Sequence, residues 1–70
     1  MKIVINNHEV VIFSGATVVD AVRAYSRRSA KLLETGKLRV FDQYGNRTEA
    51  DGELTEGQKF FLKKRDHEEA

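Results

Sequence analysis

The chain has 70 residues, of which 40% are hydrophobic and 33% are charged, and its formal net charge is +1. This length supports one domain with a small core and leaves no room for a deep active-site cleft. The absence of cysteine excludes disulfides, thiolate metal sites and cysteine nucleophiles.

The charged residues are distributed unevenly along the chain. From Ala21 to Val40 there are six basic residues and one acidic residue, whereas from Phe41 to Gly57 there are five acidic residues and one basic residue. We therefore expect a bipolar surface that orients a partner. No apolar run approaches the ~18 residues of a membrane span, and Met1–Ile5 lacks the pattern of a signal peptide. We expect a cytoplasmic protein that does not enter a membrane.

The first predicted element is a β-hairpin over residues 2–13. Two segments rich in β-branched residues flank Asn6-Asn7, and asparagine tolerates the positive φ angles of a tight turn. A two-residue loop would pair Ile5 with His8 and Ile3 with Val10. One face of the hairpin would then carry Met1, Ile3, Ile5, Val10 and Ile12, and the other Val4, Val11 and Phe13.

A single amphipathic helix is predicted to follow. Thr17 and Asp20 have the spacing of a capping box, so the helix should begin at Val18, and Gly36 is a suitable stop. At 100° per residue, an apolar arc packs inward and a basic stripe faces outward. The arc comprises Val18, Ala21, Val22, Tyr25, Ser29, Leu32 and Leu33, and the stripe contains Arg23, Arg27 and Lys31. The serines and arginines of 26–29 leave the last turns open.

Three further strands are predicted, over residues 38–41, around 47–49 and over 58–64. Turn-forming residues at 42–46 join the first two, and Leu54 in the following loop should contact the core. Alternation in the last strand points Phe60 and Leu62 inward and Phe61 outward. The right-handed crossover rule then places the last strand parallel to the first, in the middle of the sheet. We expect a domain over 1–64 and a mobile charged tail over 65–70.

Three short patterns carry a resemblance to a known family. They are M-x-I-x-I-N at Met1–Asn6, G-x-T-V at Gly15–Val18, and L-x-E-G-Q at Leu54–Gln58 followed by Phe60-Phe61-Leu62. In this order they resemble the ubiquitin-like β-grasp proteins, and most of all the sulfur carriers of thiamine and molybdopterin biosynthesis. The resemblance implies an α+β fold of ββαββ type, with a mixed sheet of four to five strands and one helix packed on one face.

The same resemblance implies a chemistry that depends on a C-terminal Gly-Gly, whose carboxylate an activating enzyme adenylates before it becomes a thiocarboxylate. This sequence ends Lys63-Lys64-Arg65-Asp66-His67-Glu68-Glu69-Ala70, and no glycine follows Gly57. Bulky and acidic side chains would not pass the narrow channel that two glycines can enter. We therefore expect a β-grasp domain without conjugation activity, and a sulfur carrier or modifier with an atypical tail remains an alternative.

The outer face of the predicted sheet is the main candidate for partner binding. It would expose Val4, Val11, Phe13, Phe41 and Phe61, and soluble monomers seldom leave such an apolar patch uncovered. In ubiquitin-like proteins this face usually docks partners. We therefore expect a non-catalytic adaptor or regulatory subunit whose partner is another protein, such as an activating or pathway enzyme. A homodimer through the same patch is the alternative.

Other candidate sites are weaker. Arg23, Arg27 and Lys31 could contact an acidic partner or RNA, but no aromatic platform lies among them, so nucleic acid is disfavoured. The acidic loops lack the D-x-D-x-D-G spacing of a calcium site. No serine or histidine has a context typical of a nucleophile or a base, so we expect no enzyme activity and no cofactor.

Overall fold

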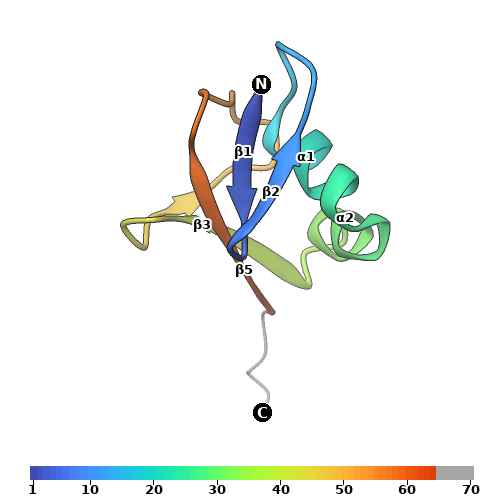
Figure 1. The fold of residues 1–70 in the computed structure, drawn as a ribbon. Coiled ribbons are helices and arrows are strands. Elements are labelled where there is room, and N and C mark those ends of the chain that lie inside the picture. Colours follow the sequence, from blue (N-terminus) through green and yellow to red (C-terminus); the bar gives the residue numbers. More distant parts are fainter. Residues whose placement is uncertain (65–70) are drawn as a thin grey trace.

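The computed structural model describes residues 1–64, which form an α+β domain with a mixed five-stranded sheet (Figure 1). The strand order is β2-β1-β5-β3-β4. β1 and β5 run parallel, and the other neighbouring strands are antiparallel. The elements are β1 (Lys2–Ile5), β2 (His8–Val11), α1 (Val18–Tyr25), α2 (Arg27–Glu34), β3 (Leu38–Asp42), β4 (Arg47–Thr48) and β5 (Lys59–Lys64). The predicted parallel pairing of the first and last strands is confirmed. The predicted tail, 65–70, lies outside the described residues.

The β1–β2 hairpin has the predicted register. Asn6 and Asn7 have φ angles of 50° and 68°, and positive φ at both central residues is what a type I′ turn requires. Ile5 pairs with His8 and Ile3 with Val10, as expected from a two-residue loop. Because side chains alternate along a strand, this register turns Ile3 and Val10 toward the same side of the sheet.

The core lies between the sheet and the two helices, which Figure 1 shows on one side of the strands. Phe60 of β5 is 2% exposed and is the largest fully buried side chain. Leu62 and Leu54 pack against the core as predicted, whereas Ile12, just beyond the end of β2, is half-buried and lies outside it. The buried members of this core are Ile3, Ile5, Val10, Val18, Ala21, Val22, Ala30, Val40 and Phe60. We call the side of the sheet away from the helices the outer face.

The prediction of one continuous helix is wrong, because the chain breaks at Ser26. Ser26 is extended, with φ −162° and ψ 118°, and ends α1 as it begins α2. Its hydroxyl accepts a hydrogen bond from the Ser29 backbone N–H at 3.1 Å, so it caps α2 and competes with continuation of α1. The break shifts the phase of α2. Ala30 is buried in place of Ser29 and Leu32, which are half-buried, while Leu33 still packs on the core.

Adjacent phenylalanines test the inward and outward assignment of β5. We expect Phe60→Ala to cost about 3–5 kcal/mol, because it opens a cavity in the core. A core of this size supplies only ~3–5 kcal/mol in total, so the variant should be largely unfolded at 25 °C. Phe61→Ala, on the outer face, should cost about 1 kcal/mol or less. Thermal unfolding followed by circular dichroism measures both, and equal losses would contradict the assignment.

The helix break has its own test. Ser26→Ala removes the side chain that caps α2 and should lower the free energy of unfolding by about 1 kcal/mol. Ser29→Ala is the matched control, since its hydroxyl makes no hydrogen bond among the described residues and alanine favours a helix interior. Urea unfolding of both variants decides the point. A Ser26→Ala variant as stable as the wild type would show that the hydroxyl does not hold the break.

Candidate partner-binding surface

The structure places four members of the predicted patch on the outer face, in a row and not as one compact cluster, whereas the fifth, Phe13, lies beyond the end of β2. Phe41 of β3 pairs directly with Phe61 of β5. Val4 pairs with Lys59, so Phe61, two residues further along β5, is its diagonal neighbour. On the other side, Val11 is diagonal to Val4, because Val4 pairs with Glu9. We call this diagonal row the apolar stripe: Val11, Val4, Phe61 and Phe41.

Exposure differs along the apolar stripe. Val11, on edge strand β2, is 75% exposed, and Phe13, just beyond the end of that strand, is 61% exposed. Val4, Phe41 and Phe61 are half-buried. The β2 end of the apolar stripe is therefore its more exposed end, and the part on β1, β5 and β3 is partly sheltered.

The sheltered end of the stripe forms a cavity of about 250 Å³. Phe41 and Phe61 line it together with residues of the β3–β4 turn, and the Lys63 ammonium lies 5.6 Å from the centre of the Phe41 ring. That distance is within the range of a cation–π interaction. We call this cavity the aromatic hollow; it is lined by Phe41, Asp42, Gln43, Gly45, Phe61 and Lys63.

The β3–β4 turn holds one wall of the aromatic hollow in place. The Asp42 carboxylate accepts hydrogen bonds from the backbone N–H groups of Tyr44 at 2.8 Å and Asn46 at 2.9 Å. Gly45 has a φ of 83°, which a side chain would disfavour. The turn leaves Tyr44 79% exposed beside the hollow. Sequence reasoning treated this segment only as a turn, although an aromatic residue among turn-forming residues was a signal for an exposed contact.

The outer face also carries a concentration of positive charge that sequence reasoning missed. Lys2 pairs with Val11, Lys59 with Val4, Arg47 with Phe41 and Lys63 with Arg39, so all five basic side chains belong to this face. We call them the basic rim: Lys2, Arg39, Arg47, Lys59 and Lys63. The outward strand positions include one acidic residue, Glu9. Within residues 1–64 both ion pairs involve Arg23, so no carboxylate is paired with the basic rim there.

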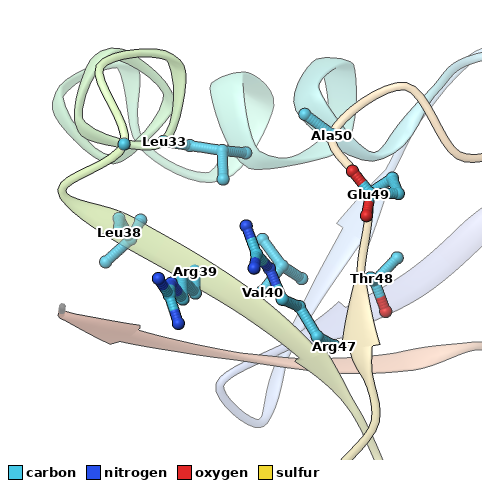
Figure 2. Close-up of a pocket in the computed structure, with 9 residues that line it drawn as sticks. Leu33, Leu38, Arg39, Val40, Arg47, Thr48, Glu49 and Ala50 are labelled. Atoms are coloured by element: carbon cyan, nitrogen blue, oxygen red, sulfur yellow. The ribbon is translucent and has the colours of Figure 1, made fainter.

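A second cavity lies at the β4 edge of the sheet, because β4 contains only two residues and leaves the first part of β3 uncovered. Figure 2 shows that its lining comes from α2, β3, and β4 with the loop that follows it. We call it the edge pocket; it measures about 250 Å³ and is lined by Leu33, Gly36, Leu38–Val40 and Arg47–Ala50. Arg39 and Arg47 of the basic rim line this pocket as well.

The predicted basic stripe of the helices is brought together, but one of its charges is already paired. Arg23, Arg27 and Lys31 line a common hollow with Glu34. Arg23 lies 2.8 Å from Glu34 and 3.3 Å from Asp20, and thereby ties α1 to α2. Arg27 and Lys31 make no ion pair within the described part of the chain.

Histidine, serine and acidic side chains are the groups among residues 1–64 that could hold a metal ion or act as nucleophiles or bases. No group of three or more His, Asp or Glu side chains is placed to hold a metal ion in this part of the chain. The ring of His8 lies 5.9 Å from that of Tyr25, and the Ser26 hydroxyl is used as a helix cap. Neither α1 nor α2 is long and apolar enough to cross a bilayer. Cytoplasmic localisation stays a prediction.

The chain matches no protein-family model, no curated protein and no solved structure.

The cap of α1 predicts a pH effect. The backbone N–H of Thr17 donates to the Asp20 carboxylate at 3.0 Å, and this bond, assisted by the Thr17 hydroxyl and Arg23, lowers the pKa of Asp20 below its usual 3.8. The folded-state pKa is depressed, so the stabilisation is present above pH 3.8 and is lost as the pH falls through the folded value.

Asp20→Asn should therefore be less stable than the wild type at neutral pH, and the difference should shrink in acid. Urea unfolding between about pH 2 and 7 measures it. Asp51→Asn is the control, because Asp51 is an exposed loop carboxylate without a hydrogen bond among the described residues. If the difference in unfolding free energy between the wild type and Asp20→Asn stays constant across this pH range, the lowered pKa of Asp20 does not contribute to stability.

Proposed function

We propose that this chain is a non-catalytic β-grasp module, an adaptor or regulatory subunit that docks a protein partner through the outer face of its sheet. The strand order β2-β1-β5-β3-β4 and the helices on one side of the sheet support the β-grasp assignment. The observation that carries the docking proposal is the aromatic hollow, which opens on the face that the helices leave uncovered.

The size of the aromatic hollow favours a side chain of a partner over a small-molecule ligand. Ligand pockets span about 300–1,000 Å³ and enclose most of their ligand, whereas this cavity measures about 250 Å³. The exposed Val11, Phe13 and Tyr44 add apolar area outside the cavity. Apolar area bordered by polar and charged residues, here the basic rim, is the usual anatomy of a protein-docking surface.

The basic rim favours a different protein over a second copy of this chain. In a two-fold symmetric dimer the same surface faces itself, so an outer-face dimer would bring two sets of five positive side chains together. Like charges that lose water in this way oppose association. The basic helix surface and the acidic loops then help to orient the partner during encounter.

The sulfur-carrier and RNA-binding alternatives stay predictions. Carrier chemistry depends on residues beyond Lys64, outside the described part of the chain. RNA binding through the helices would depend on Arg27 and Lys31, since Arg23 is held by Asp20 and Glu34.

Site-specific photo-crosslinking tests the docking surface. A benzoylphenylalanine at Tyr44, beside the aromatic hollow, should form an adduct with a discrete partner in extract of the native source. The same group at Ala24, an exposed position of α1, should not. Adding Phe61→Asp or Val11→Asp should reduce the Tyr44 adduct at least tenfold, because a buried carboxylate on this face lacks a partner. An adduct that both substitutions leave unchanged, or one formed equally from Ala24, would exclude the outer face.

A further inference from the structure

The charge of the outer face identifies the chemistry of the partner. We infer that the docked segment is an extended acidic peptide in which a bulky apolar residue enters the aromatic hollow and a carboxylate two positions away binds Arg39. This inference rests on the proposed function and specifies its partner.

The first step of the argument is the excess of unpaired positive charge. Five basic side chains and one acidic side chain occupy the outward strand positions, although the whole chain carries a net charge of only +1. Glu56, in the loop before β5, is already engaged, since it accepts hydrogen bonds from the Lys2 backbone N–H at 3.1 and 3.2 Å. Two carboxylates line the cavities themselves: Asp42, which is engaged by the Tyr44 and Asn46 backbone N–H groups, and Glu49 in the edge pocket. Positive charge still exceeds negative charge on this face, which favours a partner that supplies negative charge.

The second step is the spacing along β3. Arg39 and Phe41 are two residues apart on one face, and the pairs Arg39–Lys63 and Phe41–Phe61 are two steps apart on the β3–β5 ladder. In extended chains, side chains two positions apart also share one face and lie ~6.6 Å apart. A peptide laid along β3 can thus place an apolar side chain between Phe41 and Phe61 and a carboxylate at Arg39 and Lys63.

Arg47 adds a second anchor for a carboxylate. It pairs with Phe41 from the other side, and it lines the edge pocket together with Arg39. Guanidinium groups bind carboxylates through two parallel hydrogen bonds, which gives direction as well as attraction. Leu33 and Leu38 also line the edge pocket, as does the Glu49 carboxylate.

A peptide suits this surface better than single-stranded nucleic acid. Base stacking needs open aromatic faces, but the Lys63 ammonium lies over the Phe41 ring at 5.6 Å. Val4 and Val11 extend the apolar stripe with aliphatic groups, on which bases do not stack. A carboxylate can bind Lys63 where it lies, and an apolar side chain can contact the Lys63 methylene groups together with the rings. A stacked base needs the open ring face and would have to displace Lys63.

Titration with two synthetic peptides tests the inference. The first is Ser-Glu-Ser-Phe-Ser-Glu-Ser, which carries one carboxylate two positions before the apolar residue and another two positions after it. The second replaces both Glu residues with Lys. We expect the acidic peptide to shift the amide resonances of Arg39, Phe41, Phe61 and Lys63 in the full-length protein, and to bind at least tenfold tighter than the basic one. Addition of salt should weaken binding.

A pair of charge-matched variants separates the site from general electrostatics. Arg39→Glu with Arg47→Glu should weaken the acidic peptide at least tenfold. Arg27→Glu with Lys31→Glu makes the same change in net charge on the helices and should alter affinity less than threefold. The amide spectrum verifies folding, and Arg39→Gln with Arg47→Gln replaces the first pair if it unfolds.

Three outcomes would overturn the inference: equal binding of both peptides, equal losses in the two charge-matched variants, or tighter binding of an eight-residue oligothymidine than of the acidic peptide. Its failure is distinguishable from failure of the docking proposal. If the acidic peptide fails while Tyr44 still forms a Phe61-dependent adduct, the partner is not acidic and the outer face still docks it. If both fail, the outer face is not the site.

Discussion

The parallel pairing of β1 with β5 is the constraint on which the rest of the domain depends. Val4 N–H donates to the Gln58 carbonyl and Asn6 N–H to the Phe60 carbonyl, while the Asn6 side chain accepts from Leu62 N–H, 56 positions away. These hydrogen bonds join residues far apart in the sequence, so forming them closes a long loop and costs conformational entropy. Burial of apolar side chains must offset that cost. Phe60 provides that burial, because the same pairing carries it between the sheet and the helices.

This pairing gives two neighbouring, chemically identical side chains opposite roles. Phe60 stabilises the fold from inside the core, whereas Phe61 stands on the outer face and pairs with Phe41. In a domain this thin, one layer of strands separates the core from the proposed binding surface. The register that holds the fold therefore also positions the aromatic hollow, and a slip of one residue would exchange the two phenylalanines.

The hairpin and the faces of the strands could be predicted from the sequence because local chemistry fixes them: Asn6 and Asn7 set the loop length, and the loop length sets the register. The break at Ser26 could not be predicted in the same way, since the periodicity on both sides also fits one helix. The structure instead has an extended Ser26 whose hydroxyl caps α2. The basic rim could not be predicted from charge along the chain. Its members come from four strands, and one of them, Arg47, lies in a segment that is otherwise acidic.

In the proposed docking mode, the basic rim selects against partners as well as for them. A purely apolar partner could fill the aromatic hollow, but it would remove water from Arg39 and Lys63 without compensating their charge, and that cost can exceed the gain from apolar contact. A partner with carboxylates meets both requirements at once, because Arg39–Lys63 and Phe41–Phe61 belong to one ladder and keep a fixed spacing. Specificity on so small a surface then comes from the distance between charge and apolar anchor, which the backbone sets, more than from the depth of either site.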